Sequence, residues 1–291
     1  MKRYAFIYNP AARGGKAERK VELLKHQILD WPGAKLFRSK QKGDISELVS
    51  QLVPDYDVLV ACGGDGTVRE VASELVFTEK TMGIIPLGTG NDLCKTLKIP
   101  VNITDSLEML RRRESTLVDV GQCNDFFFLN SLGFGFDGLA NRYALEMDWL
   151  PPLLRYAVAA LKATVKQEIF EIKIHDDVTE VTKELIMATL ANGRVEGGSF
   201  WISPTASIID GKLDFIAIRP VSKWFIPLLL PFFLIKKPVW IPQVQTSKIE
   251  QVTLLFSEPQ EIHADGEIIR TDKRKFNIRL IPKRLNVICG L

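Results

Sequence analysis

The feature that most constrains the fold is a strand-like run that ends directly in a glycine-rich turn. Residues 58–62 are apolar, residues 63–67 read GGDGT, and a helix-like segment follows at residues 68–76. In such a turn, glycines let the backbone approach a ligand closely, and N–H groups at the start of the helix face an anion. The segment therefore predicts a phosphate-binding turn. The alternative interpretation is an ordinary turn in which Thr67 only caps the helix.

Two further turns of small residues follow predicted strands. The strand at residues 82–86 leads into LGTGND at residues 87–92, and the strand at residues 4–8 leads into NPAARGGK at residues 9–16. Open α/β sheets bind ligands beyond the carboxyl ends of their strands, so we expect the three turns to converge on one nucleotide pocket. Asp65, in the GGDGT turn, would supply a carboxylate oxygen to Mg²⁺.

Two other nucleotide-binding motifs fit the sequence poorly. The GxxxxGK[ST] phosphate loop is absent, because Ala17 follows Lys16 and Pro10 stands where the first glycine would be. Residues 133–138 (GFGFDG) match GxGxxG, but no acidic residue ends a following strand about 20 residues later. A Rossmann dehydrogenase is therefore disfavoured.

The order of strand-like and helix-like runs predicts two domains, as does the length of 291 residues. In the first third, strands alternate with helices, which is typical of a parallel α/β sheet. From about Asp119 onward, short β-rich runs indicate an antiparallel β-sandwich with a helical insert at about residues 149–165. The runs interpreted as its strands include residues 126–129, 170–174, 185–190, 213–218, 251–256 and 276–280.

Composition and residue spacing exclude several classes of protein. Lys and Arg number 38 against 35 Asp and Glu, and the resulting charge of +3 is too small and too mixed to suggest nucleic acid as a partner. The 4 cysteines and 3 histidines are scattered, which argues against a zinc cluster or a disulfide framework. The apolar run at the N-terminus is too short for a signal peptide, so we expect a cytoplasmic location.

The longest apolar run, at residues 224–235 (WFIPLLLPFFLI), is interrupted by two prolines and flanked by lysines. A membrane-spanning helix needs about 20 apolar residues, so this run is too short to cross a bilayer. It is either a buried core segment or a segment for the membrane interface, where aromatic rings sit at the headgroup level and lysines meet anionic lipid. The second interpretation predicts peripheral membrane association.

Taken in order, the motifs resemble the diacylglycerol kinase catalytic-domain family, and within it the soluble bacterial lipid kinases. GGDGT alone is shared with NAD kinases and phosphofructokinases, whereas the ordered set is much more specific. The resemblance covers nearly the whole chain, through YNP at residues 8–10, GGDGT, LGTGND, VDVG at 118–121, NSLGFGFD at 130–137, the segment from SP at 203–204 to DGKLD at 210–214, and DGE at 265–267.

The resemblance implies a fold similar to that of NAD kinases and diacylglycerol kinases. Residues 1–120, rejoined by residues 282–291, would form a nucleotide-binding α/β domain, residues 121–281 would form a β-sandwich lipid domain, and ATP would lie in the cleft. Ser39 stands where the family often has Thr, which keeps the hydroxyl. The residues that the resemblance assigns to nucleotide binding are Asn9, Pro10, Ala11, Ala12, Arg13, Ser39, Gly63, Gly64, Asp65, Gly66, Thr67, Val68, Arg69, Thr89, Asn91 and Asp92.

The resemblance also implies a structural Mg²⁺ near Asp210. In similar proteins this aspartate holds the ion together with backbone carbonyls at the positions of Ser207 and Lys212. An apolar residue is common in place of Lys212, but only the carbonyl would be used. Taken alone, Asp210-Gly211 is typical of a turn after residues 208–209.

Phosphoryl transfer needs positioning, charge stabilisation by Mg²⁺ and a group that accepts the proton of the attacking hydroxyl. Asp265 and Glu267 lie two residues apart on a strand-like segment, which would place both carboxylates on one face. The resemblance implies that Asp265 is the general base and that Glu267 and Asp119 complete the carboxylate group, although either Asp265 or Glu267 could take the proton. The alternative is a solvated hairpin turn. His263, on the same predicted face, is interpreted as a structural histidine.

The expected function is transfer of the γ-phosphate of ATP to the hydroxyl of diacylglycerol or a related lipid, which forms phosphatidic acid or a similar phospholipid. The alternatives are an NAD kinase-like phosphotransferase and a non-catalytic nucleotide-binding protein. The lysine-flanked apolar run favours a lipid over a soluble dinucleotide, and the carboxylates favour catalysis. The acceptor lipid and the oligomeric state, a homodimer included, stay open.

Overall fold

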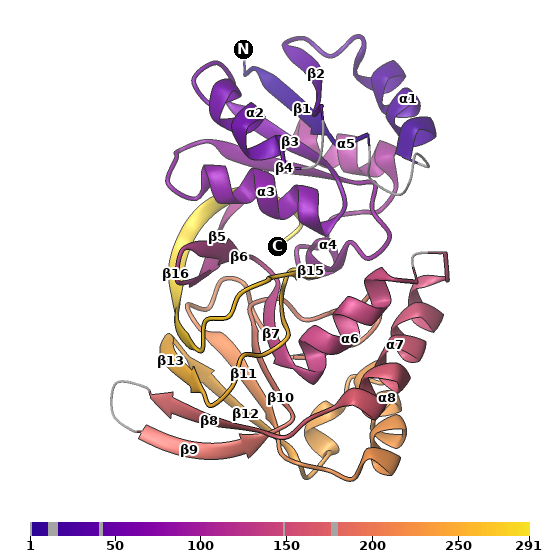
Figure 1. Ribbon diagram of the computed structural model, residues 1–291. Coiled ribbons are helices and arrows are strands. Elements are labelled where there is room, and N and C mark those ends of the chain that lie inside the picture. The colour runs from indigo at the N-terminus through magenta and orange to yellow at the C-terminus, as the bar shows by residue number, and fades with distance from the viewer. Residues whose placement is uncertain (1, 11–16, 41–42, 148, 176–179) are drawn as a thin grey trace. The chain divides into compact units, whose positions relative to one another are not determined.

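The computed structural model describes residues 2–10, 17–40, 43–147, 149–175 and 180–291 (Figure 1). The chain forms two compact units: Met1–Val120 with Lys283–Leu291, and Gly121–Pro282. Two strands, β5 (Ser115–Cys123) and β16 (Lys275–Ile288), contribute residues to both units. Among the helices of the described residues, none combines the length and the apolar character needed to cross a membrane.

A parallel sheet forms the centre of the first unit. Its strand β1 (Tyr4–Tyr8) lies between β2 (Ala34–Arg38) and β3 (Val58–Gly63), and β4 (Thr81–Pro86) pairs with β3. The end of β16 completes the sheet next to β4. Every residue of β1, β3 and β4 is buried, as expected for strands of a parallel sheet that is covered on both faces.

The helices of the first unit lie on opposite faces of this sheet because the crossover from β1 to β2 runs in one direction along it, whereas those from β2 to β3 and from β3 to β4 run in the other. On one face, α1 (Ala17–Ile28) and α5 (Ile103–Arg112) share an apolar core with alternate residues of β1 and β3. On the other, α2 (Ile45–Leu52) and α3 (Asp65–Leu75) pack against each other (Figure 1). The short helix α4 (Asp92–Thr96) follows the turn after β4.

The second unit is a β-sandwich. Its strands, besides parts of β5 and β16, are β6 (Phe126–Phe128), β7 (Ser131–Gly135), β8 (Phe170–His175), β9 (Glu180–Leu185), β10 (Met187–Ala191), β11 (Leu213–Ile218), β12 (Val244–Ile249), β13 (Gln251–Phe256), β14 (Ile262–Ala264) and β15 (Glu267–Ile268). One sheet has the order β12-β11-β10-β7-β14-β15, and the other joins β16, β13, β8 and β9. Alternate residues of both sheets, including Phe134, Phe170 and Phe256, form one core.

Three helices accompany the sheet that contains β10. Helix α6 (Phe136–Leu145) follows β7 directly, α7 (Pro152–Lys166) packs against α6, and α8 (Ile226–Leu234) packs against α7. Met187 and Ile216 of the sheet share an apolar cluster with Ile226 and Phe233 of α8. The single-turn segments η2 (Lys223–Phe225) and η3 (Pro238–Trp240) flank α8 in the chain.

The predicted fold class, an α/β part followed by an antiparallel β part, is confirmed. One predicted strand is wrong, because residues 185–190 belong to two strands in different sheets. Strand β9 ends at Leu185, Ile186 donates its N–H to Ile218, and β10 begins at Met187. The final strand was expected at residues 276–280 and instead continues to Ile288, because its end pairs with β4 in the first unit.

Candidate functional site

The two glycine-rich turns of the first unit touch each other. Strand β3 ends at Gly63, and its carbonyl oxygen accepts the N–H groups of Leu87 and Gly88 at 2.9 and 3.1 Å. A Cβ on Gly88 would lie 2.4 Å from the Cα of Gly64, so a side chain at this position is incompatible with the contact. The two turns predicted from the sequence are therefore neighbours at one edge of the parallel sheet.

Asp65 connects the two turns. Its Oδ1 accepts the backbone N–H of Asp92 at 2.8 Å, and the side chain of Asn91 donates to the carbonyl of Gly88 at 3.0 Å. The Asp92 carboxylate forms an ion pair with Lys95 at 3.0 Å. Asp65 and Asp92 therefore bring two carboxylates together where the turns meet, and carboxylate oxygens are ligands that suit Mg²⁺.

Asn9 directly follows β1 and Ser39 directly follows β2. Both residues therefore lie at the edge of the parallel sheet where its strands have their carboxyl ends. Ser39 is buried, and its hydroxyl forms no hydrogen bond with any described residue. Buried hydroxyls normally have a partner, so this one fits contact with a bound ligand. The first part of α3 contains the predicted residues Gly66, Thr67, Val68 and Arg69. The second turn contains Thr89, and Pro10 follows Asn9. Three other predicted residues lie outside the described part of the chain: Ala11, Ala12 and Arg13.

Asp265 lies in a tight turn and not, as predicted, on a strand. Asp265 and Gly266 have φ angles of +50° and +82° and connect β14 to β15 as a two-residue hairpin. The prediction that Asp265 and Glu267 share one strand face is therefore wrong, because the side-chain alternation of a strand does not apply within the turn. The hairpin is not solvated at this point, since Asp265 is only 7% exposed.

The carboxylate of Asp265 holds the backbone of the β6–β7 connection. Its Oδ1 accepts the N–H groups of Asn130 at 2.7 Å and of Ser131 at 3.0 Å, and its Oδ2 accepts that of Leu129 at 2.9 Å. Glu267, in β15, is half-buried. Backbone N–H donors favour the ionised carboxylate, so the turn fixes the orientation of a negative charge.

Asp119, the third predicted carboxylate, belongs to the first unit. It is fully buried in β5, and its Oδ1 accepts the N–H of Lys283 at 2.8 Å. Lys283 has a φ of +50°, so this hydrogen bond stabilises an unusual backbone position in β16. Asp119 therefore has a structural contact within its own unit.

Asp210, which was predicted to hold a structural Mg²⁺, forms an ion pair with a lysine. The carboxylate accepts the N–H of Lys212 at 3.1 Å and binds the ammonium of Lys248, which also lies 3.3 Å from Asp214. The hydrogen bond to Asp210 raises the pKa of Lys248, which keeps the ammonium charged. The structural Mg²⁺ near Ser207, Asp210 and Lys212 therefore stays a prediction, and its binding would require Lys248 to release the Asp210 carboxylate.

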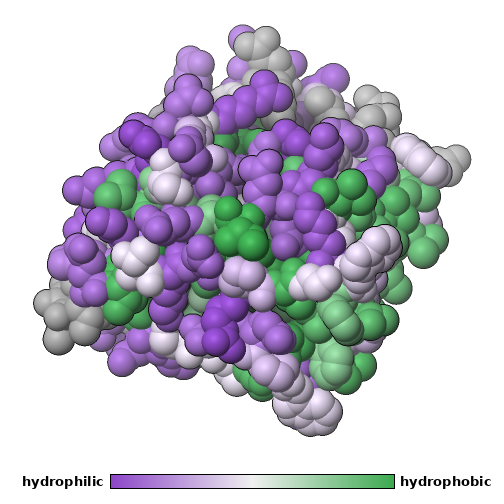
Figure 2. All heavy atoms as spheres, turned by 60° about the horizontal axis from the view of Figure 1, so that its bottom comes forward, coloured by the Kyte–Doolittle hydropathy of each residue, from purple (hydrophilic) through white to green (hydrophobic). Residues whose placement is uncertain are grey.

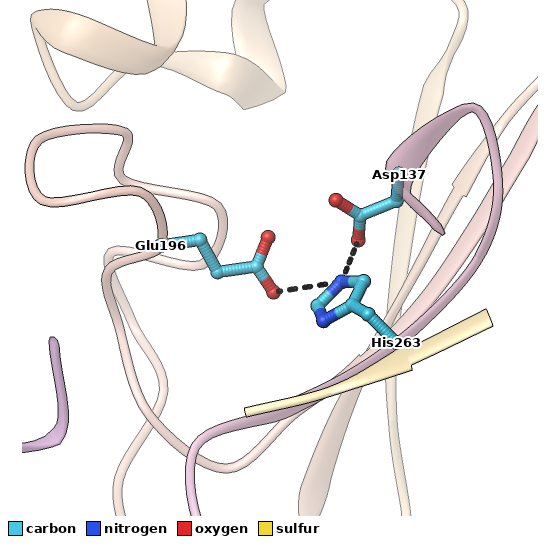
Figure 3. A group of neighbouring side chains, drawn as sticks. All are labelled: Asp137, Glu196 and His263. Atoms are coloured by element: carbon cyan, nitrogen blue, oxygen red, sulfur yellow. Dashed lines mark ion pairs between the residues drawn. The ribbon is translucent and has the colours of Figure 1, made fainter. Parts of the chain in front are cut away.

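A buried polar cluster, formed by Asp137, Glu196 and His263, lies in the second unit (Figure 3). His263 Nε2 is 3.1 Å from Oδ2 of Asp137 and 4.0 Å from Oε1 of Glu196. The hydroxyl of Thr189 donates to the same Asp137 oxygen at 2.6 Å. Gly133 lies beneath the cluster, where a Cβ would come within 2.3 Å of His263 Nε2.

Burial and mutual charge shift the pKa values of this buried polar cluster. Burial disfavours the Asp137 anion, but the charge of His263 and the hydrogen bonds to the carboxylate, that of the Thr189 hydroxyl included, together outweigh this effect and lower the pKa of Asp137. Burial, reinforced by the charge of Asp137, raises the pKa of Glu196 to about 8. Burial disfavours the imidazolium of His263, but the carboxylates of Asp137, Glu196 and Asp265, with Asp137 first, together outweigh burial and raise the pKa of His263 to about 9.

An apolar cavity adjoins this buried polar cluster. Its walls come from α6, α7 and α8 and from the sheet beneath them, and Asp137 and Glu196 also line it. Apart from these two carboxylates and Asn141, the lining is almost entirely apolar or aromatic, with Tyr156, Leu229 and Phe233 among its members. A long hydrocarbon group suits such walls.

Two family profiles together cover almost the whole chain. Residues 3–123 match the diacylglycerol kinase catalytic domain, and residues 130–289 match the YegS C-terminal NAD kinase beta sandwich-like domain. The chain belongs to the diacylglycerol kinase catalytic-domain family. The family predicted from the motifs is confirmed, and with it a lipid kinase class, whose members are phosphotransferases that use a nucleotide.

Individual relatives agree with the family. A protein of Pseudomonas putida named "Probable lipid kinase YegS-like" is 28% identical, over 86% of this chain and 84% of its own length. A diacylglycerol kinase structure from Bacillus anthracis has a TM-score of 0.75 at 22% identity, covering 99% of this chain and 97% of that one. Yeast NADH kinase shares the fold with a TM-score of 0.54 at 13% identity, over 98% and 82% of the two chains.

The sequence did not indicate most of the buried polar cluster found in this family member. Asp137 was noted only as part of a motif, Glu196 was not singled out, and His263 was interpreted as structural. The three residues come from distant parts of the chain, so no spacing rule connects them. The one available signal was the histidine in a strand-like run, which the fold places opposite Gly133.

Proposed function

We propose that this protein is an ATP-dependent lipid kinase that transfers the γ-phosphate of ATP to the hydroxyl of diacylglycerol or a related lipid alcohol. The new bond joins the lipid oxygen to the γ-phosphorus, the bond between the γ-phosphorus and the bridging oxygen breaks, and ADP leaves. The product is phosphatidic acid or an analogous phospholipid. The observation that favours a lipid acceptor is the apolar cavity in the second unit, because its apolar walls would add little binding energy for a soluble dinucleotide.

In this proposal the first unit binds the nucleotide. The touching turns at Gly64 and Gly88 present backbone N–H groups and the start of α3 to the phosphates. The buried hydroxyl of Ser39 would form a hydrogen bond with the nucleotide. Asp65 and Asp92 would hold Mg²⁺, which neutralises the charge that develops on the phosphates. Residues 1–120 with 282–291 thus form the nucleotide domain, and residues 121–281 form the lipid domain.

The proposed catalytic carboxylates are Asp265, Glu267 and Asp119. Asp265 is the candidate that accepts the proton of the lipid hydroxyl, and its orientation is fixed by three backbone N–H groups. Glu267, in the second unit, and Asp119, in the first, are the other two proposed carboxylates, each with the role of positioning hydroxyl or metal. A base held in a fixed orientation supports transfer because the reacting atoms must be aligned before the proton moves.

The acceptor is tested by a mixed-micelle kinase assay with ATP and Mg²⁺. Diacylglycerol, phosphatidylglycerol, a sphingoid base and a polyprenol are compared with NAD as the soluble acceptor, and products are identified by mass. We expect a phosphorylated lipid and no NADP. Phosphorylation of NAD alone would favour the alternative kinase, and no product with any acceptor would refute the lipid kinase assignment.

The cavity is tested by filling it. Ala160 lies on α7 and lines the cavity, whereas the neighbouring Leu161 is exposed. Ala160→Phe should raise the KM for the lipid by about tenfold or more and leave ATP binding unchanged, because the added ring removes space only from the acyl chain. Leu161→Phe is the matched control on the same helix. Equal lipid kinetics in both variants would contradict the cavity as the lipid site.

We also propose that the surface around α8 attaches the protein to membranes. Here the interfacial patch comprises Trp224, Phe225, Leu228, Ile235 and Trp240, and Trp224 is 89% exposed. Figure 2 shows apolar side chains gathered on the right, the side on which α7 and α8 lie in Figure 1. Other residues of α8, such as Leu229 and Phe233, line the cavity, so lipid from the bilayer would have a short path into it.

An anionic bilayer is the partner that suits the interfacial patch. Lys236 lies over the half-buried ring of Trp201 at 3.8 Å, and Lys237 lies over the exposed ring of Trp240 at 5.1 Å, so positive charges lie beside the interfacial patch. Trp224→Ala with Phe225→Ala should reduce co-sedimentation with phosphatidylglycerol vesicles. Leu29→Ala, an exposed apolar residue of the first unit, is the control. Equal sedimentation of all three proteins would count against the patch.

A further inference from the structure

The buried polar cluster of Asp137, Glu196 and His263 has no role in the phosphoryl transfer proposed above. Asp137 lies in the first turn of α6, Glu196 in the loop after β10, and His263 in β14. One oxygen of each carboxylate and one ring nitrogen all lie within 4.8 Å of one another. Figure 3 shows the three side chains pointing toward one another from three separate segments.

His263 shows that this arrangement is incomplete as a network of hydrogen bonds. The ring is 1% exposed, and neither nitrogen forms a hydrogen bond with a described residue, although Nε2 lies 3.1 Å from Asp137 Oδ2. Oε1 of Glu196 likewise has no hydrogen bond with a described residue. A close approach without hydrogen-bond alignment is expected when the atoms face a common point rather than each other.

We propose that Asp137, Glu196 and His263 bind one divalent transition metal ion of the Zn²⁺ or Mn²⁺ class. Imidazole and carboxylate are ligands that both ions accept. In a tetrahedral site with bonds of about 2.0–2.1 Å, the ligand atoms lie roughly 3.4 Å apart. The distances of 3.1 and 4.0 Å from His263 Nε2 bracket this value. Binding would displace the protons that His263 and Glu196 hold, and two carboxylates with a neutral imidazole then balance the charge of a divalent ion.

The surroundings keep the ligand atoms in place. The Thr189 hydroxyl donates to Asp137 Oδ2 at 2.6 Å, which is the kind of contact that orients a metal-binding carboxylate. The absence of a side chain at Gly133 leaves the space in which Asp137 Oδ2 and His263 Nε2 lie, since a Cβ there would be 2.2 and 2.3 Å from them. Three protein ligands leave one position of a tetrahedral ion for another molecule, and Asp137 and Glu196 border the apolar cavity.

The test measures metal binding to the full chain without nucleotide or lipid. After chelator treatment and gel filtration, the protein is titrated with ZnCl₂ and MnCl₂ by calorimetry, and bound metal is counted by mass spectrometry. Co²⁺ serves as a spectroscopic probe of nitrogen and oxygen ligands. We expect one equivalent of metal per chain. Because no kinase activity is measured, failure of this site and failure of the proposed lipid kinase function are distinguishable.

Variants connect the binding to these residues. Glu196→Gln keeps the size of the side chain and should weaken binding at least about 100-fold, and Thr189→Val should weaken it about 10- to 100-fold by removing the orienting hydroxyl. Asp272→Asn is the control, because it removes an exposed acidic group outside the buried polar cluster. His263→Gln is a further ligand variant, and Glu196→Gln decides the outcome if His263→Gln does not fold. No stoichiometric binding, or binding that Glu196→Gln leaves unchanged, would overturn the proposal.

Discussion

Replacing Asp265 by Asn should destabilise the second unit as well as stop catalysis. The carboxylate is the hydrogen-bond acceptor for three consecutive backbone N–H groups, those of Leu129, Asn130 and Ser131. An Asn side chain has a single acceptor oxygen. If that oxygen keeps the bonds to Asn130 and Ser131, the amide NH₂ faces the N–H of Leu129, and two donors oppose each other.

The cost follows from these three contacts. One buried N–H without an acceptor costs about 1–3 kcal/mol, and the two remaining bonds lose charge assistance worth about 0.5–1 kcal/mol each. We expect the free energy of unfolding to fall by about 3 kcal/mol. For a unit of this size, about 2–4 °C of Tm corresponds to each kcal/mol, so Tm should fall by about 6–12 °C.

The measurement is thermal unfolding followed by circular dichroism, together with lipid kinase turnover well below the lowered Tm. Asp272→Asn is the matched control, because it makes the same chemical change at an exposed position of the same unit. A Tm of Asp265→Asn within 2 °C of the wild type, a margin smaller than the expected shift, would refute the role of this carboxylate in holding the turn. Undiminished turnover would refute its role as the base.

Three further predictions concern local features of the chain. Gly133→Ala should lower the free energy of unfolding by about 1–3 kcal/mol in chemical denaturation, because the added Cβ would lie 2.2 Å from Asp137 Oδ2. Asn102→Ala should cost about 1 kcal/mol in the same measurement, since the Asn102 side chain accepts the N–H of Thr104 at the start of α5. Burial raises the pKa of Cys123 to about 12, so its thiol should react with a disulfide reagent at pH 8 only after denaturation; rapid labelling of the native protein would contradict this burial.

The first unit was largely predictable because its signals are local. A buried parallel strand is a continuous apolar run, and the glycine-rich turn that ends it is recognisable in the next few residues, as in β3 and residues 63–67. The predicted strand at residues 82–86 differs from β4 by one residue at its start. What the sequence lacked was the contact between the turns, because the approach of Gly64 to Gly88 depends on the pairing of β3 with β4.

The hairpin at Asp265 was misinterpreted although its signal was present. Asp-Gly is a preferred pair for a two-residue turn with positive φ angles, and apolar residues precede and follow it. The strand interpretation gave more weight to the apolar flanks than to the turn residues. No local pattern, however, indicated that the buried Asp265 would accept hydrogen bonds from the segment that begins β7, because that contact joins distant parts of the chain.

Strand β7 explains how one short segment serves both the core and the buried polar cluster. Leu132 and Phe134 point into the sandwich core, whereas Gly133 lies on the opposite face, beneath Asp137 and His263. In β14, His263 pairs with Gly133 in register, while its neighbours in the chain enter the core. Because side chains alternate between the faces of a strand, residues on the cluster face can change without changing core packing. Phe134→Ala should therefore act mainly on folding, by about 3–5 kcal/mol, whereas Thr189→Val should act mainly on what the cluster binds.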